Sequence, residues 1–156
     1  LHEACHALMD MSARELGRKQ ASFPGWLMEG LACWMETTLS GRAGALMFDP
    51  AKLNLDYFKA HHGARKRDGL TRVLNYGSGD FLSSTGQNRR YAQSYTLVHF
   101  LQESGDDELR QQFMGFLHSA WSGKGSTSHF KKYFGKKTDQ LEKRWTTLVK
   151  EIAEAE

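Results

Sequence analysis

The sequence has 156 residues, of which 40% are hydrophobic, 25% charged and 12% aromatic. This composition is typical of one folded domain with its own core and excludes an intrinsically disordered chain. No apolar stretch approaches the roughly 20 residues that span a bilayer, so we expect no transmembrane segment. The 21 Lys and Arg against 18 Asp and Glu leave a net charge of +3. A charge this small does not favour nucleic acid as a partner.

The two cysteines, Cys5 and Cys33, are too few for a disulfide framework, and neither lies in a CxxC pair. We interpret both as small buried hydrophobic residues, and the cellular compartment stays open. The first residue is Leu1, and the most informative motif begins at the second residue. We therefore expect the chain to be part of a longer polypeptide, in which an export signal would lie upstream.

The first 36 residues predict two helices. Apolar residues recur at helical spacing from Leu1 to about Gly17, where the glycine favours a stop. A turn over residues 22–25 precedes a second helix over 26–36. That segment is apolar on most sides, so we expect the second helix to be buried.

The rest of the chain divides into a middle part and a helical C-terminal part. Residues 37–90 are interrupted by glycines and predict loops with one or two helices, near 53–60 and 71–76. Later helical patterns are expected over 91–103, from 106 onward, over 126–133, and from 138 to the C-terminus. No segment alternates convincingly at period two. The fold class is therefore mainly α, and we expect any sheet to lie mostly upstream of this chain.

The first functional motif is His2-Glu3-Ala4-Cys5-His6, which has the pattern HExxH. On a helix, His2 and His6 lie about 40° apart around the axis, so both imidazoles can reach one metal ion. Glu3 points about 100° away, which suits a base that accepts a proton from water. The alternative is a surface helix that carries two histidines.

A second motif, Trp26-Leu27-Met28-Glu29-Gly30-Leu31-Ala32, places a carboxylate in an apolar helix. An unpaired charge there is costly, and a metal ion would explain it. Two histidines and one glutamate are a common ligand set of catalytic zinc. We therefore interpret Glu29 as the third ligand, with an exposed or Arg-paired carboxylate as the alternative.

The segments HEACH, FPGWLMEGLACWME and YAQSYTLVHFL together resemble the gluzincin zinc metallopeptidases, specifically the peptidase-MA-like bacterial domain family. The resemblance covers residues 1–36 and 91–104 well and residues 37–90 hardly at all. It implies a single zincin-like catalytic domain fragment over residues 1–156. Residues 1–36 would form the metal-site helices, 37–90 a loop-rich middle and 91–156 the helical C-terminal part.

The resemblance also implies a function. One zinc ion would be held by His2, His6 and Glu29, and Glu3 would be the general base in hydrolysis of a peptide or protein substrate. The resembling enzymes have an upstream sheet that holds the substrate backbone, so this chain by itself is expected to be weakly active or inactive. The alternatives are a catalytically silent metal-binding module and a helical protein-interaction module without metal.

The same resemblance implies that Tyr91 hydrogen-bonds the developing oxyanion, which a neutral phenol can do. Tyr95, one turn later, is the second choice, and either tyrosine could be an ordinary core aromatic. Glu36 lies near the stripe of Glu29 and is a candidate to orient a histidine ligand through its free ring nitrogen. Asp10, one turn after His6, is the weaker candidate for that role. A solvated helix charge is the alternative for both acids.

Overall fold

The computed structural model describes residues 1–15, 23–42, 45–49, 52–135 and 138–155. Within these ranges the protein is mainly helical, as the sequence predicts. No helix in the described ranges is long and apolar enough to cross a membrane. The elements in chain order are α1 (His2–Glu15), α2 (Gly25–Thr38), β1 (Leu39–Arg42), β2 (Ala45–Phe48), α3 (Leu55–His62), α4 (Leu70–Val73), α5 (Ser78–Leu82), α6 (Gln87–Glu103), α7 (Asp107–Trp121), α8 (Thr127–Phe134) and α9 (Asp139–Glu154).

The predicted helices are confirmed, with small differences at their ends. The predicted stop of the first helix at Gly17 lies outside the described residues. Helix α6 begins at Gln87, four residues before the predicted start. Helix α7 begins after Asp106, whose side chain accepts a hydrogen bond from the backbone N–H of Leu109 at 2.9 Å. This N-cap explains why the sequence pattern located that end well.

The middle of the chain is more ordered than the sequence predicts. Helices α3, α4 and α5 form there, and β1 and β2 pair as an antiparallel ribbon with Leu39 opposite Phe48. The ribbon and α5 are the elements that the sequence did not indicate. The strands of the ribbon have four residues each, and so short a segment cannot show a convincing period of two.

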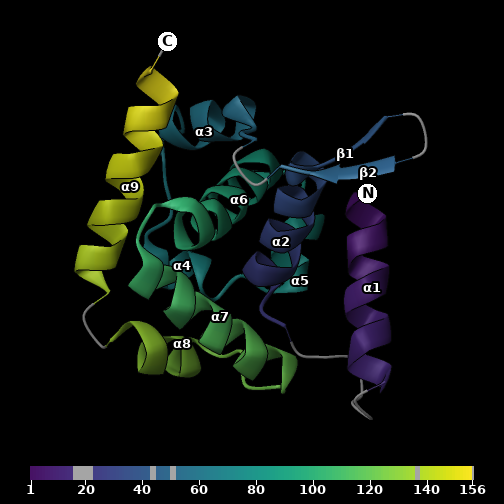
Figure 1. Cartoon of the computed structure of the whole chain (residues 1–156). Coiled ribbons are helices and arrows are strands. Elements are labelled where there is room, and N and C mark those ends of the chain that lie inside the picture. The colour runs from purple at the N-terminus through teal and green to yellow at the C-terminus, as the bar shows by residue number, and fades with distance from the viewer. Residues whose placement is uncertain (16–22, 43–44, 50–51, 136–137, 156) are drawn as a thin grey trace.

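Helix α6 lies at the centre of the fold, and α2, α3, α7 and α9 pack around it (Figure 1). The close approach of α2 to α6 depends on Gly30. A Cβ atom at this position would lie 2.6 Å from the carbonyl oxygen of Ser94 and 2.7 Å from Cγ2 of Val98. Because these distances are shorter than any real contact of a Cβ atom, the packing of the two helices requires glycine here.

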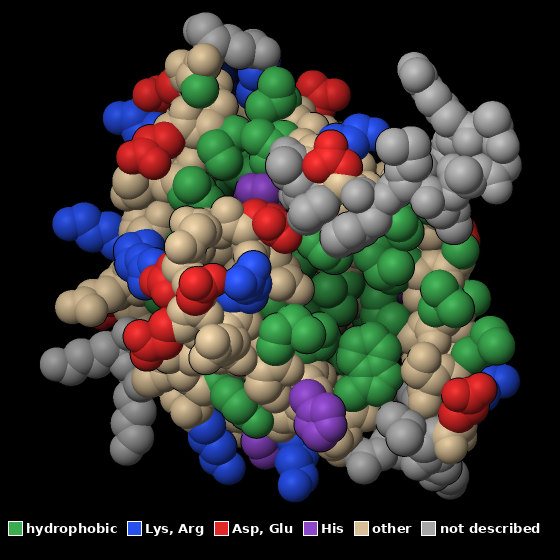
Figure 2. Space-filling model, viewed as in Figure 1, with side chains coloured by type: hydrophobic (Ala, Val, Ile, Leu, Met, Phe, Trp, Pro, Cys, Tyr) green, Lys and Arg blue, Asp and Glu red, His purple; other side chains and the backbone are tan. Residues whose placement is uncertain are grey.

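Helix α1 packs against α2 at one side of this bundle (Figure 1). Cys5 and Met9 are buried in the contact, whereas Leu8 and Met11 are exposed. Figure 2 shows hydrophobic side chains gathered in the hollow between α1 and the neighbouring helices. The position of α1 relative to α2 decides how the residues of the two sequence motifs meet.

A polar network fixes the segment that follows α4. The side-chain amide of Gln93 on α6 donates to the carbonyl oxygen of Asp68 at 2.7 Å, and the hydroxyl of Tyr76 donates to the Asp68 carboxylate at 2.6 Å. The carbonyl oxygen of Tyr76 in turn accepts a hydrogen bond from the N–H of Gly25 at 2.8 Å. These bonds hold the backbone around residue 76 against the start of α2, beside the site described next.

Candidate metal centre

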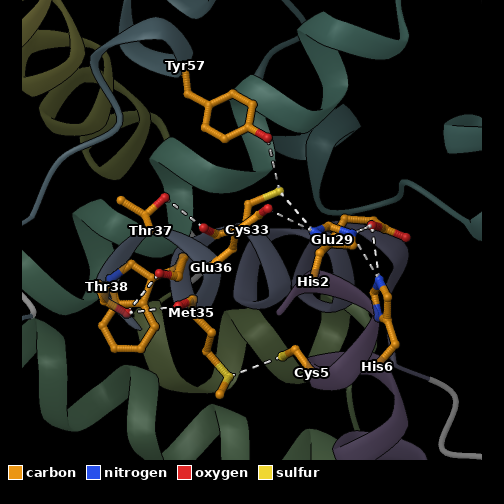
Figure 3. A network of polar contacts seen from close by, with 11 residues as sticks. His2, Cys5, His6, Glu29, Cys33, Met35, Glu36, Thr37, Thr38 and Tyr57 are labelled. Atoms are coloured by element: carbon orange, nitrogen blue, oxygen red, sulfur yellow. Dashed lines mark hydrogen bonds and ion pairs between the residues drawn. The ribbon is translucent and has the colours of Figure 1, made fainter. Parts of the chain in front are cut away.

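The packing of α1 on α2 brings His2, His6 and Glu29 together (Figure 3). Nε2 of His2 lies 3.2 Å from Oε2 of Glu29, and Nε2 of His6 lies 3.4 Å from the same oxygen. The two Nε2 atoms are 3.2 Å apart. All three side chains are partly buried, with between 16% and 22% of their area exposed. The three residues that the sequence proposed as ligands therefore converge on one point.

The spacing of these three atoms fits a bound metal ion. Ligand atoms in a tetrahedral zinc site lie about 2.0–2.2 Å from the metal, which places them about 3.3–3.5 Å from one another. The observed separations of 3.2, 3.2 and 3.4 Å are close to this value. Two imidazole nitrogens and a carboxylate oxygen are also ligand atoms that suit zinc. The described geometry can therefore hold one divalent ion without rearrangement of the helices.

Glu3 is placed beside the cluster and not in it. It is exposed, and together with His6, one of the three cluster residues, it lines a pocket. Among the described residues, the convergent group contains His2, His6 and Glu29 alone. This position matches the angular offset between Glu3 and the histidines on the helix. The carboxylate of Glu3 is free to contact water or a ligand in the pocket.

Tyr91 faces the cluster. Its ring centroid lies 6.1 Å from that of His2, and Glu29 and Gln87 are close enough to its hydroxyl to influence its pKa. Burial, and then the negative charge of Glu29, raise the pKa of Tyr91 above its ordinary value. The phenol is therefore a neutral hydrogen-bond donor at physiological pH, next to the proposed ligands.

Tyr95 belongs to the core and is not part of the cluster. It is completely buried, its hydroxyl accepts a hydrogen bond from the N–H of Asn54 at 2.9 Å, and its ring packs against Tyr57 and Phe58. The structure thus places Tyr91, the first choice from the sequence, near the cluster, and Tyr95, the second choice, in the core. Tyr91 is the one placed to contact a ligand at the cluster.

The ring nitrogens that face away from the cluster differ in their surroundings. Nδ1 of His2 lies 3.6 Å from the Glu36 carboxylate and 3.8 Å from Sγ of Cys33. Nδ1 of His6 is buried and has no hydrogen-bond partner among the described residues. Glu36 is therefore placed to orient His2, as the sequence suggested. Asp10 does not orient a histidine and instead forms an ion pair with Arg14.

Tyr57 is a neighbour of the site that the sequence analysis did not identify. Its hydroxyl lies 3.5 Å from Sγ of Cys33 (Figure 3). Burial raises the pKa of Cys33 to about 12, and that of Cys5 to about 11. Both thiols therefore stay protonated, which agrees with their interpretation as buried residues and not as thiolate ligands. The sequence did not identify Tyr57 because it lies in the glycine-interrupted middle of the chain, where no motif marks it as functional.

The pocket next to the cluster has a volume of about 720 Å³ and lies between α1, the start of α2 and the segment after α4. Its described lining combines acidic, apolar and backbone groups. These residues are Glu3, His6, Ala7, Met9, Asp10, Phe23, Pro24, Gly25, Met28, Tyr76, Gly77 and Ser78. The pocket is large enough to admit an amino-acid side chain or a small peptide segment beside His6.

The fold and this site define a mainly helical protein with a cluster of two histidines and one glutamate between adjoining helices. The chain belongs to the family described as a protein of unknown function, DUF1570, whose sequence model matches residues 1–120. The match includes both helices of the cluster and Tyr91. Searches among curated proteins and among solved structures gave no match.

Proposed function

We propose that the protein is a zinc-dependent hydrolase of peptide bonds, of the gluzincin type that its motifs resemble. One observation carries the proposal. The two histidines of HExxH and the glutamate of the second motif, 27 residues from His2, approach one another at the spacing of a tetrahedral metal site. The residues of a HExxH helix need not meet a third ligand unless the second helix packs at this position, so the convergence supports a metal-binding role.

Zinc at this site would supply Lewis-acid polarisation of the substrate carbonyl and would lower the pKa of a water molecule. The chain's own residues supply the remaining chemistry. Glu3, at the rim of the pocket, takes the proton from the attacking water and transfers it to the leaving amine. Glu36, whose carboxylate lies 3.6 Å from Nδ1 of His2, would accept a hydrogen bond from that nitrogen after a small shift and so leave Nε2 as the ligand atom.

Tyr91 stabilises the charge that develops on the substrate oxygen. Its hydroxyl is close enough to Glu29 for that carboxylate to influence its pKa, and a substrate carbonyl that enters the site would accept a hydrogen bond from this donor. Such a bond strengthens as negative charge grows on the oxygen, so it lowers the barrier more than it stabilises the bound substrate. The partner in this proposal is a peptide or protein substrate.

A catalytically silent metal-binding module is the second candidate. Leu8 and Met11 on α1 are each more than half exposed, as is Met114 on α7. Exposed apolar side chains near one another are typical of surfaces that bind other proteins. In that case the metal would fix α1 to α2, and the surface of α1 would bind a partner.

The test separates metal binding from catalysis in the full-length protein. Glu3→Gln should retain about one zinc per molecule by elemental analysis, because Glu3 is outside the ligand cluster, while peptide hydrolysis falls by about 100-fold or more. Glu15→Gln removes an exposed charge from the same helix and should change neither. Full hydrolysis in Glu3→Gln would contradict the mechanism, and zinc without any hydrolysis in the wild type would favour the silent module.

The tyrosines provide a second comparison. Tyr91→Phe should keep zinc and slow turnover by about 100-fold, as expected for removal of one oxyanion donor. Tyr95→Phe is the matched control, because its hydroxyl is engaged in the core. A larger loss of turnover in Tyr95→Phe than in Tyr91→Phe would show that the oxyanion role is wrongly placed.

A further inference from the structure

The pocket beside the cluster has a feature that the proposed reaction does not require. Its walls are apolar on several sides, formed by Met9, Phe23, Pro24 and Met28. Walls of this kind suit the hydrocarbon part of a side chain. The acidic groups of the pocket, Glu3 and Asp10, both come from α1.

The pocket is acidic in a chain that is basic overall. Glu3 and Asp10 line it, and its described lining contains no Lys or Arg, although the whole chain carries a net charge of +3. A negatively charged pocket attracts cationic groups and disfavours anionic ones. The apolar walls would bind any long hydrocarbon side chain, and the carboxylates favour those side chains that end in a positive charge.

Asp10 is the carboxylate with an incomplete set of partners. Its Oδ2 pairs with Arg14 at 2.6 Å, but the Arg14 side chain is 73% exposed, and such surface pairs contribute little stability. Its Oδ1 is covered and has no hydrogen-bond partner among the described residues, so Oδ2 is the oxygen that a ligand can reach. A carboxylate with one oxygen unsatisfied depends on the donors at the other, and a ligand cation in the pocket could replace the exposed Arg14 at Oδ2.

The distance between Asp10 and the cluster indicates the length of the ligand. Glu3, His6 and Asp10 lie along the same side of α1, toward the pocket. Asp10 is four residues beyond His6, so it lies about 6 Å farther along the helix axis. Lysine and arginine carry their charge at the end of a long apolar stem, which can cover this distance along apolar walls.

We propose that this pocket receives the side chain of a lysine or arginine adjacent to the peptide bond that is cleaved, with Asp10 as its charge partner. The part that concerns cleavage rests on the proposed function. An acidic side chain is repelled by Glu3 and Asp10, and a norleucine side chain fills the apolar walls but leaves Asp10 paired with Arg14 alone. The site thus discriminates by the charge at the tip of the side chain.

Binding and cleavage are measured separately on the full-length protein. The binding probes are short peptides, N-methylated at the scissile amide to prevent hydrolysis, that differ only in carrying lysine, norleucine or glutamate on either side of that bond. Calorimetry should show the lysine peptide binding about 10-fold more tightly than norleucine, with glutamate weakest. Unmethylated versions of the same peptides report hydrolysis.

Variants then assign the preference to Asp10. Asp10→Asn should remove the advantage of lysine and leave the norleucine peptide within about 2-fold of the wild type, since only the charge partner is lost. Glu15→Gln, on the same helix outside the pocket, should leave the preference intact. Arg14→Gln should strengthen binding of the lysine peptide, because it removes the internal cation that competes for Asp10, and this variant decides the question if Asp10→Asn does not fold.

The outcomes distinguish this inference from the proposed function. Equal binding of lysine and norleucine peptides in the wild type, a lysine preference that persists in Asp10→Asn, or unchanged lysine affinity in Arg14→Gln would each overturn the assignment of the pocket. A lysine preference in binding together with no hydrolysis of any peptide would overturn the proposed reaction and leave the pocket assignment standing. Hydrolysis that depends on Glu3 but is equally fast for the lysine and norleucine peptides would support the proposed reaction and overturn the pocket assignment.

Discussion

Replacement of Gly30 by alanine tests the contact on which the fold and the site both depend. The added Cβ would lie 2.6 Å from the Ser94 carbonyl oxygen, about 0.8 Å inside the 3.4 Å at which ordinary contact begins. Because that oxygen belongs to the backbone of α6, the clash cannot be relieved by a side-chain rotation. Helix α2 must instead move away from α6.

The expected cost follows from two opposing effects. Overpacking of a well-packed contact costs about 1–3 kcal/mol, whereas alanine favours the helix over glycine by about 1 kcal/mol. The difference is a net loss of about 0–2 kcal/mol, and because the clash is with backbone we expect about 2 kcal/mol, which lowers the unfolding midpoint of a chain of this length by about 5 °C. Zinc affinity should also fall, by about 10-fold, because Glu29 is adjacent to Gly30 and ligand positions tolerate shifts of only about 0.5 Å.

Thermal unfolding followed by circular dichroism measures the first effect, and competition with a chelator of known affinity measures the second. Gly79→Ala is the matched control, since a Cβ there meets nothing within 4 Å and alanine should be neutral or stabilising by up to about 1 kcal/mol. If Gly30→Ala keeps both the wild-type midpoint and the wild-type zinc affinity, the close approach of α2 to α6 does not position the cluster.

Two further predictions concern the metal and pH. Removal of zinc by a chelator should lower the unfolding midpoint by about 10 °C, because an ion at 1,000 times its dissociation constant stabilises the native state by about 4 kcal/mol. An unchanged midpoint in protein shown to hold zinc would mean that the ion does not join α1 to α2. In metal-free protein, burial lowers the pKa of His61 and His99 to about 4. The unfolded chain therefore binds more protons than the native state between about pH 6.5 and 4, so the free energy of unfolding should fall by about 3 kcal/mol per histidine as the pH drops through that range. Urea unfolding at several pH values measures this, and His99→Leu should lose about half of the dependence; the full dependence in that variant would show that His99 is not its source.

The sequence by itself determined the helices and the identity of the proposed ligands. The helix ends that it located well are those with local signals, such as Asp106 before α7. HExxH is also a local pattern, because the period of one helix places His2 and His6 on the same side. Glu29 was predicted from a charge in an apolar helix, and this inference needed no knowledge of how α1 and α2 pack.

Other features were decided only by tertiary structure. The resemblance already favoured Tyr91, but the position of Tyr91 near His2 and of Tyr95 in the core depends on how α6 lies against α2. Tyr57 meets Cys33 through a contact between segments 24 residues apart in sequence, and no local pattern reports such a contact.

Asp10 shows most directly what the sequence could not decide. Its spacing from His6 suggested a role in orienting a histidine, but the position of α1 places it in the pocket, paired with Arg14. Helical periodicity states which residues share a side of a helix, and it does not state what that side faces. The partners of Asp10 are set by packing between helices, which the sequence of one helix does not encode by itself.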